Sequence, residues 1–256
     1  MTFDPDPLVV LISGASRGLG RGLAERYLLR PDHTVIAANR DPSSPSSQSL
    51  LTLPHHPTSR LILVKLDATI ESDAAAAVRV LQTEHGIDHL DIVIANAGAA
   101  FVYPYVRDVK SQDLREHLDL NVFGVLWLFQ ATRELLRRSS RGPKWVTMGS
   151  SAGSLANTPD VPSGVYGASK AMVHWLTKRV HFEEDWLTSF VMHPGWIQTD
   201  MGLHSTKEFG MDDAMTQKLL LKNGESHPGM MKVIDEATRE THGGKFWNYE
   251  GTQEAW

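Results

Sequence analysis

Cysteine is absent from this sequence of 256 residues. Without cysteine the chain has no disulfide bond, no zinc site built on thiolates and no thiol nucleophile. The absence is typical of a reducing compartment, and we expect a cytoplasmic protein. Histidine occurs 12 times, but never in the His-Glu-x-x-His spacing of a catalytic zinc helix, so we predict no metal.

The chain also lacks long hydrophobic runs and a large excess of one charge. Its first apolar run, 8–12, follows an acidic start and is too short for a secretory signal. No stretch approaches the roughly 20 apolar residues that a membrane span requires. The net charge of −5 gives no general attraction to nucleic acid or to anionic membranes, so we predict neither as a partner.

Short runs rich in valine, isoleucine and leucine alternate with amphipathic stretches along the chain. The expected strands are 8–12, 33–40, 60–67, 90–98, 144–151, 189–195 and 245–251, and the longer expected helices are 73–85, 111–138, 166–184 and 231–240. Near-continuous apolar strands separated by helices require a parallel sheet that is covered on both faces. We therefore predict an α/β, doubly wound Rossmann fold, with about seven strands and helices on both faces.

Two stretches interrupt this alternation. Residues 41–59 are rich in serine and proline, and we interpret them as a surface loop because the alternation resumes directly afterwards. Residues 201–230 contain no clean strand, and we interpret them as a mobile, substrate-binding insertion with short helices. Neither stretch is typical of a linker, so we predict a single domain over residues 1–256.

A glycine-rich turn, SGASRGLG, directly follows the first strand and opens a helix. Gly14 allows a sharp turn, Gly18 allows the backbone to approach a pyrophosphate, and Gly20 allows close packing of the helix on the sheet. The strand before and the helix after favour a dinucleotide site over a simple tight turn. The cofactor contacts expected here are Gly14, Ser16, Arg17, Gly18, Leu19 and Gly20.

The second strand ends in ANRD, where an NAD-selective site favours an acidic residue for the ribose hydroxyls. Here Arg40 occupies the end of the strand, next to Asn39, and Arg17 lies in the glycine turn. Guanidinium groups bind phosphate well, so we predict NADP(H) in preference to NAD(H), with Arg40 favoured as the ligand of the 2′-phosphate. Two alternatives stay open, namely two solvated arginines or a ribose contact from Asp41.

Two further strands end in residues suited to the same crevice. Asp67 ends the third strand, where it either accepts from the adenine amino group or caps the following helix. Asn96, Ala97 and Gly98 follow the fourth strand with little side-chain bulk, so a cofactor ribose can lie against their backbone.

A tyrosine and a lysine stand four residues apart in SGVYGASKAMVHW. This spacing places Tyr166 and Lys170 on one face of a helix. A nearby ammonium favours the phenolate and lowers the pKa of the phenol, which suits it to act as general acid for a carbonyl oxygen. Taken alone, such a tyrosine is more often a packing residue.

Polar residues elsewhere in the chain support the catalytic interpretation. GSSAGS, at the end of the strand 144–151, offers Ser150 or Ser151 as a hydrogen-bond donor to the same oxygen. Asn121 lies in the middle of an expected helix, where an amide is unfavourable unless it has a task. We expect it to hold a water that relays protons to Lys170.

The chain resembles the short-chain dehydrogenase/reductase family across nearly its whole length. The motifs that carry the resemblance are, in chain order, SGASRGLG, NAG, Asn121, SSAG, YGASK and HPGWIQTDM. HWLTKRVHFEE, HPGWIQTDMG and KFWNYEGT further resemble its fungal norsolorinic-acid-ketoreductase-like members. The resemblance implies Tyr166 as the catalytic acid/base, Lys170 as its tuner and a ribose ligand, and Asn121 as the relay. Alignment on the glycine of SSAG favours Ser150, although the loop before Ser163 is longer than in many members. The implied contacts to the nicotinamide are Tyr166, Lys170, Pro194, Gly195, Ile197 and Thr199.

The family resemblance implies an NADPH-dependent reductase of a carbonyl on a hydrophobic, polyketide-like or other secondary-metabolite substrate, with a homo-oligomer (dimer or tetramer) as the assembly. Reduction of an iminium and a non-catalytic NADPH-binding module are the alternatives. Bulky side chains flank the NAG turn and the Pro-Gly motif at 194–195, and we expect them to line a flat apolar cavity. The expected substrate contacts are Phe101, Tyr103, Trp196 and Met201.

Overall fold

One sheet forms the centre of the molecule in the computed structural model, which describes residues 7–256; the acidic start at 1–6 lies outside the described residues. In chain order its strands are β1 (Leu8–Ser13), β2 (His33–Asn39), β3 (Arg60–Lys65), β4 (Ile92–Ala95), β5 (Lys144–Met148), β6 (Thr188–His193), β7 (Phe246–Asn248) and β8 (Gln253–Glu254). Within residues 7–256 these eight strands are arranged in the order β3-β2-β1-β4-β5-β6-β7-β8. All neighbours pair in parallel except β7 and β8, which are antiparallel. The predicted doubly wound sheet is confirmed, with one strand more than expected, because β8 consists of two polar residues and has no apolar pattern.

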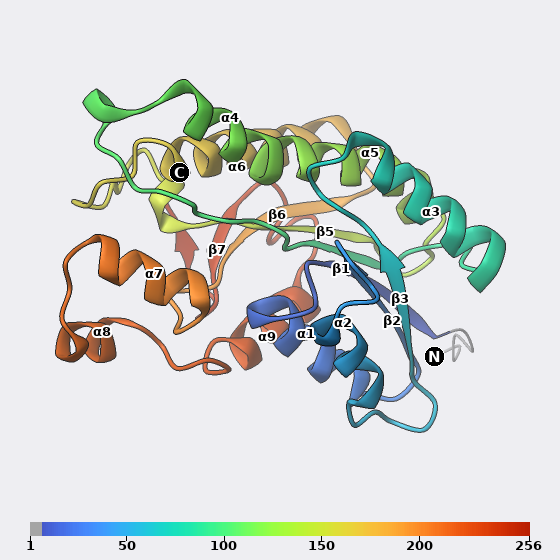
Figure 1. Cartoon of the computed structure of the whole chain (residues 1–256). Helices are drawn as coiled ribbons and strands as arrows, with labels where there is room; N and C mark the ends of the chain where they lie inside the picture. Colours follow the sequence, from blue (N-terminus) through green and yellow to red (C-terminus); the bar gives the residue numbers. More distant parts are fainter. Residues whose placement is uncertain (1–6) are drawn as a thin grey trace.

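Helices cover both faces of this sheet (Figure 1). The helices are α1 (Gly18–Leu28), α2 (Pro45–Gln48), α3 (Glu71–His85), α4 (Ser111–Leu118), α5 (Gly124–Arg137), α6 (Tyr166–Glu183), α7 (Asp200–Glu208), α8 (Asp213–Leu219) and α9 (His227–Glu236), with shorter turns η1 (Ser49–Thr52), η2 (Val106–Asp108), η3 (Asp119–Phe123) and η4 (Ser151–Gly153). α3 to α6 cover one face, α1, α2 and α9 cover the other, and α7 and α8 lie at one end. The strand order reverses between β1 and β4, which is where open sheets of this kind bind ligands.

The long helix predicted for 111–138 contains a π-helical turn. α4 and α5 are joined by η3, in which the hydrogen bonds span one residue more than in an α-helix. Such a turn is often found at functional sites because it inserts one extra residue and re-aims the side chains around it. Here the inserted turn contains Asn121, which is buried.

The stretch 41–59, expected to be a loop, contains helical turns, whereas the short helices expected in 201–230 are present. Residues 41–59 include α2 and η1, and the Ser44 hydroxyl accepts the Ser47 N–H at the start of α2. Residues 201–230 include nearly all of α7, then α8 and the start of α9. The last helix begins at His227 rather than at residue 231, because Pro228 fits its first turn, and it ends at Glu236.

Alternate side chains of the central strands pack into two apolar layers. From β1, Val10 and Ile12 pack with the layer under α1 and α9, whereas Val9 and Leu11 pack with the layer under α3 and α5. Phe129 of α5 packs edge-on against buried Trp145, with ring centroids 5.2 Å apart. The predicted homo-oligomer stays a prediction.

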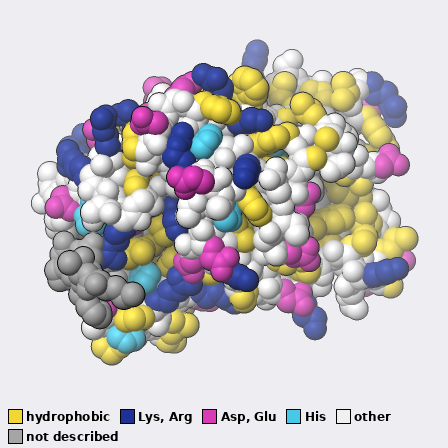
Figure 2. All heavy atoms as spheres, turned by 180° about the vertical axis from the view of Figure 1, so that it is seen from behind, with side chains coloured by type: hydrophobic (Ala, Val, Ile, Leu, Met, Phe, Trp, Pro, Cys, Tyr) yellow, Lys and Arg dark blue, Asp and Glu magenta, His cyan; other side chains and the backbone are white. Residues whose placement is uncertain are grey.

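On the face opposite to that of Figure 1, hydrophobic side chains gather towards one end (Figure 2). Basic and acidic side chains are interspersed over much of the rest of this face, without a broad patch of one sign. Among residues 7–256, no helix has the length and apolar character that a membrane crossing requires.

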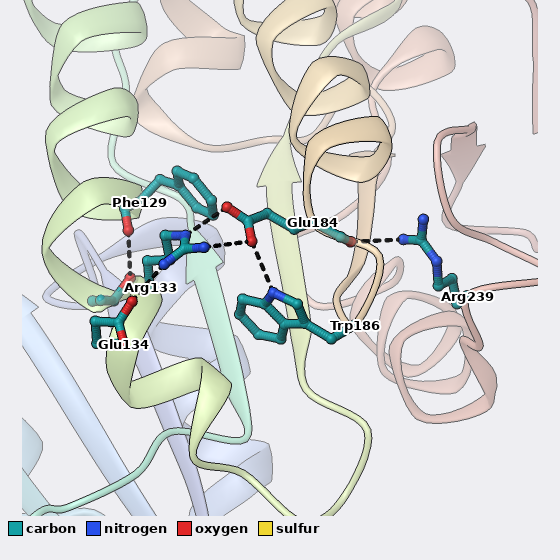
Figure 3. A network of polar contacts seen from close by, with 7 residues as sticks. Phe129, Arg133, Glu134, Glu184, Trp186 and Arg239 are labelled. Carbon is teal, nitrogen blue, oxygen red and sulfur yellow. Dashed lines mark hydrogen bonds and ion pairs between the residues drawn. The ribbon is translucent and has the colours of Figure 1, made fainter.

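A polar network ties α5 to the end of α6 (Figure 3). The Arg133 guanidinium binds both carboxylate oxygens of Glu184, with Nε–Oε1 at 2.5 Å and a second nitrogen 2.8 Å from Oε2. The Trp186 indole N–H donates to Oε2 at 2.8 Å, and Arg239 donates to the Glu184 carbonyl at 2.9 Å. The Arg133 hydrogen bonds hold the pKa of Glu184 below its usual value.

We predict that Glu184→Gln lowers the free energy of unfolding at pH 7 by about 1–3 kcal/mol, because two charge-assisted hydrogen bonds are lost. The pKa of Glu184 is lower in the folded state than in the unfolded chain, where it is about 4.3. The stability that the Glu184 carboxylate contributes is therefore fully present above the unfolded pKa and is lost as the pH falls through the folded pKa. Urea denaturation should therefore separate variant and wild type at pH 7, and the difference should shrink as the pH falls through the folded pKa of Glu184. Glu183→Gln, which breaks the exposed pair with Arg179, is the control and should cost less than about 0.5 kcal/mol.

Candidate active site

The glycine-rich turn connects β1 to α1 at the point where the strand order reverses. Gly14 has a φ of +67°, a conformation that favours glycine, and a Cβ at this position would lie 3.0 Å from the Ala97 Cα. A Cβ on Gly20 would lie 2.5 Å from both the Gly14 carbonyl oxygen and the Asn96 side-chain nitrogen. The backbone of the turn is therefore packed directly against the residues that follow β4.

Hydrogen bonds fasten the ends of β1 and β4 to each other. The Ser13 hydroxyl accepts the N–H groups of Asn96 and Ala97, both at 3.0 Å. The Asn96 side chain donates to the carbonyl oxygens of Ser13 at 2.8 Å and Gly14 at 3.2 Å. The Asn96 amide thus holds the crevice together, while Gly98 remains available at its surface, lining the cavity described below.

The end of β2 presents one buried amide and one exposed guanidinium. Asn39 is 2% exposed, and within residues 7–256 neither its side-chain oxygen nor its nitrogen has a hydrogen-bond partner. Arg40 follows it and is exposed. The Asp41 carboxylate accepts the N–H and the hydroxyl of Ser43, at 2.9 and 2.6 Å, and these bonds lower its pKa. Arg17, the other predicted phosphate ligand, forms an ion pair of 2.8 Å with Asp200 at the start of α7.

Asp67 does not cap a helix, which corrects one of its two predicted roles. The residue before α3 is Ile70, and it has no capping side chain. Asp67 instead accepts the backbone N–H of Thr69 at 3.0 Å and its hydroxyl at 2.7 Å. Aspartate commonly forms such a turn with the residue two positions ahead, and here the competing local bond prevails. Its predicted contact with adenine stays a prediction.

Tyr166, Lys170 and Ser150 meet at the carboxyl ends of β5 and β6 and line one cavity. The Lys170 ammonium donates to the Met148 carbonyl oxygen at 2.8 Å and lies 5.8 Å from the centre of the Tyr166 ring. Tyr166 is in hydrogen-bond contact with Ser150, whereas Ser151 is exposed. The structure therefore brings the predicted tyrosine, lysine and first serine together.

Asn121 reaches the same place from the π-helical turn η3. Its side-chain oxygen accepts the Ala99 N–H at 2.9 Å, and its nitrogen donates to the Ala99 carbonyl at 2.8 Å and to the Ser169 hydroxyl at 3.0 Å. A Cβ on Gly98 would lie 3.1 Å from the Asn121 oxygen and 3.6 Å from the Lys170 nitrogen. Asn121 and Lys170 thus flank the backbone of Gly98 in the crevice.

Burial determines the ionisation of the site. It raises the pKa of the Tyr166 phenol above its usual value, although the hydrogen bond from Ser150 acts in the opposite direction. Burial also lowers the pKa of Lys170 to about 8. The direction is opposite to the lowering predicted from the proximity of Lys170, because burial removes solvent from around the phenolate.

The cavity has a volume of about 230 Å³ and an aromatic wall. Tyr103 packs edge-on against Phe209, with ring centroids 4.9 Å apart, and lies 6.2 Å from the Tyr166 ring. The Trp196 indole donates to the Ser205 hydroxyl at 3.0 Å, which ties the loop after β6 to α7. Of the predicted contact residues, the cavity is lined by Leu19, Asn96, Gly98, Tyr103, Ser150, Tyr166, Lys170, Pro194, Gly195, Trp196, Ile197, Thr199 and Met201.

Phe101, which was predicted to contact the substrate, lies outside the wall of this cavity. Its side chain is 45% exposed and packs edge-on against His117 at 5.1 Å, and its backbone N–H donates to the His117 ring nitrogen at 3.0 Å. Several further residues line the cavity without having been predicted, and two of them, Ser205 and Phe209, follow Met201 at intervals of four residues. That spacing, which places side chains on one helix face, is the signal that would have found them.

A second depression, of about 440 Å³, lies between α1 and α9. It contains none of the predicted site residues, and the Arg30–Asp235 ion pair, at 2.7 Å, lines it. The smaller cavity is the better candidate because it joins the sheet edge, the tyrosine and the lysine.

Comparison with known proteins agrees with this geometry. Residues 8–208 match the family described as short chain dehydrogenase. The chain belongs to the short-chain dehydrogenase/reductase family. It is therefore an oxidoreductase, of a class of dehydrogenase that works with a nicotinamide cofactor.

Fungal ketoreductases are among the similar members of the family. Norsolorinic acid ketoreductase nor1 of Dothistroma septosporum is 40% identical over 251 residues, which are 96% of this chain and 91% of that protein. Norsolorinic acid ketoreductase of Aspergillus parasiticus is 38% identical over 256 residues, 98% of this chain and 92% of that protein. The resemblance drawn from the motifs is thereby confirmed.

A solved relative has the same fold. NADPH-bound carbonyl reductase from chicken fatty liver superposes with a TM-score of 0.84 at 28% identity, covering 98% of this chain and all of that one. The family and the fold predicted from the sequence are therefore shown by independent comparisons.

The residues at the carboxyl edge of the sheet fit a nicotinamide dinucleotide. Gly14 and Gly20 let the turn pack against Ala97 and Asn96 beside the start of α1, where backbone N–H groups favour phosphate. The buried Asn39 amide, without a partner among residues 7–256, offers both a donor and an acceptor at the end of β2. The polar groups of the cavity lie beyond, at the ends of β5 and β6.

Proposed function

We propose that this enzyme reduces a ketone on a hydrophobic, polyketide-like aromatic substrate, with NADP(H) as its cofactor and Tyr166 as the general acid. The observation that carries the proposal is the cavity in which the Tyr166 phenol, Ser150 and Lys170 face a wall formed by Tyr103, Trp196 and other aromatic side chains. A phenol and a hydroxyl on one side and an apolar wall on the other suit a carbonyl attached to a flat apolar body.

In this proposal the chain binds the ketone, holds its oxygen and delivers a proton to it. A bound nicotinamide supplies the hydride for the carbonyl carbon. The Ser150 hydroxyl and the Tyr166 phenol donate hydrogen bonds to the carbonyl oxygen, and Tyr166 transfers its proton as negative charge develops there. Burial raises the pKa of the phenol, so it is protonated at neutral pH, which is the form that a reduction requires.

Lys170 and Asn121 support this proton transfer without contacting the carbonyl oxygen. In our proposal the Lys170 ammonium, within 5.8 Å of the phenol ring, stabilises the phenolate after the proton has left. Lys170 also binds the nicotinamide ribose and, with a pKa of about 8, can return a proton near neutral pH. Asn121 fixes the backbone around Gly98, along which protons reach Lys170 through water.

An assay with defined products tests the proposed function. Purified protein is mixed with NADPH and a panel of aryl ketones, and both cofactor oxidation and alcohol formation are measured. We expect alcohol and oxidised cofactor in equal amounts, with larger flat ketones preferred over small aliphatic ones. NADPH binding without turnover of any ketone would contradict a reductase and favour a binding module.

The preference for NADP(H) rests on the end of β2. Asp41, the alternative ribose contact, is engaged by Ser43, and the neighbouring Arg40 supplies an exposed guanidinium for a 2′-phosphate. We predict that Arg40→Ala weakens NADPH binding about tenfold or more and leaves NADH binding nearly unchanged, since a hydrogen bond to a charged group contributes about 1.5–3 kcal/mol. Fluorescence titration with each cofactor measures this effect. Arg60→Ala is the matched control, because Arg60 lies at the start of β3, away from the carboxyl ends of the strands. If Arg40→Ala weakens the binding of NADPH and of NADH equally, the assignment is refuted.

A further inference from the structure

His174 lies one helical turn beyond Lys170 on α6 and is 2% exposed. Its imidazole occupies the space between the two glycines of the motif GSSAG. A Cβ on Gly149 would lie 2.5 Å from the His174 Nε2, and a Cβ on Gly153 would lie 2.9 Å from its Cε1. Both glycines around the two serines are thus needed for the ring to approach this turn.

The ring makes one hydrogen bond to the turn, and that bond is to Ser150. The Ser150 backbone N–H donates to Nε2 at 3.3 Å, so Nε2 is an acceptor and the ring proton is on Nδ1. Burial, with Lys170 and His193 nearby, lowers the pKa of His174 to about 3 and keeps the ring in this neutral form. Within residues 7–256, Nδ1 has no hydrogen-bond partner. A buried polar atom left unpaired is unfavourable, which indicates that the histidine has a task other than stability.

Aromatic side chains hold the imidazole in place from the other side. The Phe246 ring of β7 lies 4.7 Å from it, and the Trp256 ring lies 6.1 Å from it and stacks on Phe246. The Trp256 carbonyl also accepts the Ala156 N–H at 2.8 Å, in the loop that follows the serine turn. The ring therefore has little freedom to move away from Ser150.

We propose that His174 is a positioning residue that fixes the backbone of Ser150 and thereby aims its hydroxyl at Tyr166. The Ser150 hydroxyl accepts the Ala152 N–H at 3.2 Å and hydrogen-bonds the phenol, so rotation of its backbone would misdirect both contacts. Without the acceptor on His174, the turn that contains Ser150 loses the hydrogen bond that orients it. This inference rests on the proposed function, because it assigns His174 to the same reduction.

Three variants and a double-mutant cycle test the proposal, with kcat for ketone reduction and Kd for NADPH as readouts. His174→Gln offers an amide oxygen near the position of Nε2 and should keep kcat within about threefold of the wild type. His174→Leu removes the acceptor and should lower kcat about ten- to a hundredfold, because small displacements of a positioned group have such effects. The Kd for NADPH should change less than about twofold in both. Val173→Ala, which removes buried volume at the adjacent position of α6, is the control and should lower stability but not kcat.

The cycle distinguishes action through Ser150 from a general loss of structure. If His174 acts through Ser150, His174→Leu should have little further effect on kcat in a Ser150→Ala background. An equal loss in both backgrounds, or a Gln variant as slow as the Leu variant, would overturn the proposal. If the Leu variant does not fold, His174→Asn, whose shorter side chain cannot reach the Ser150 N–H, replaces it in the same cycle. Failure of the proposed function would appear separately, as unchanged turnover when Tyr166 itself is replaced.

Discussion

Tyr166→Phe is expected to lower kcat for ketone reduction by about 10²- to 10⁴-fold, the usual contribution of a positioned general acid. The substitution removes only the phenol oxygen and keeps the ring, so the edge-on contact with Tyr103 and the packing of α6 remain. Because burial raises the pKa of Tyr166, the wild-type phenol is protonated at neutral pH and its proton is available to the substrate oxygen. Without that proton the oxygen must take one from water in a largely apolar cavity.

The measurements that check this are single-turnover cofactor oxidation and a fluorescence titration with NADPH. The Kd for NADPH should stay within about twofold of the wild type, which would show that the loss lies in the chemical step. Tyr27→Phe is the matched control, because the Tyr27 hydroxyl is buried in the core without a hydrogen-bond partner among residues 7–256. Turnover by Tyr166→Phe at the wild-type rate would rule out the proposed mechanism.

Gly20→Ala is expected to weaken NADPH binding about a hundredfold and to destabilise the fold by about 1–3 kcal/mol. The added Cβ would lie 2.5 Å from the Gly14 carbonyl oxygen and 2.5 Å from the Asn96 side-chain nitrogen. These two atoms form the hydrogen bond that fastens the ends of β1 and β4, so relief of the clash must separate them. The glycine turn would then no longer present its N–H groups as one cradle.

A glycine at the end of α3 supplies the control for this prediction. Gly86 has a φ of +66°, and a Cβ there would meet no atom within 4 Å. Gly86→Ala should therefore lower stability by about 1–2 kcal/mol through backbone strain alone and leave NADPH binding unchanged. Urea denaturation gives the stability of both variants, and fluorescence titration gives their Kd values. If Gly20→Ala binds NADPH as tightly as Gly86→Ala does, the close packing at Gly20 is not required.

Local patterns along the chain were sufficient for much of the fold and of the candidate site. Short apolar runs predict seven of the strands, most clearly β1, β3 and β4, whose Val, Ile and Leu side chains are largely buried in the sheet. The four-residue spacing of Tyr166 and Lys170 places them on one helix face whatever packs around them. Helix and strand periods fix such relations between neighbours, and parallel strands bring their carboxyl ends to one edge.

Some features of the site depend on segments that are far apart in the sequence. Phe101 has the side chain expected of a cavity residue, but it packs against His117, whereas Phe209 reaches the cavity from the position directly after α7. Neither placement follows from a local pattern, because each depends on which partner from another part of the fold is nearer.

The sequence by itself determined the order of strands and helices, the glycine turn at the first crossover and the pairing of Tyr166 with Lys170. The tertiary structure alone decided the direction of the Tyr166 pKa, the π-helical turn that delivers Asn121 and the position of His174 beneath Ser150. The reason is physical. Periodicity and turn chemistry act over a few neighbouring residues, whereas burial and hydrogen-bond partners are set by everything that packs around a group from the rest of the chain.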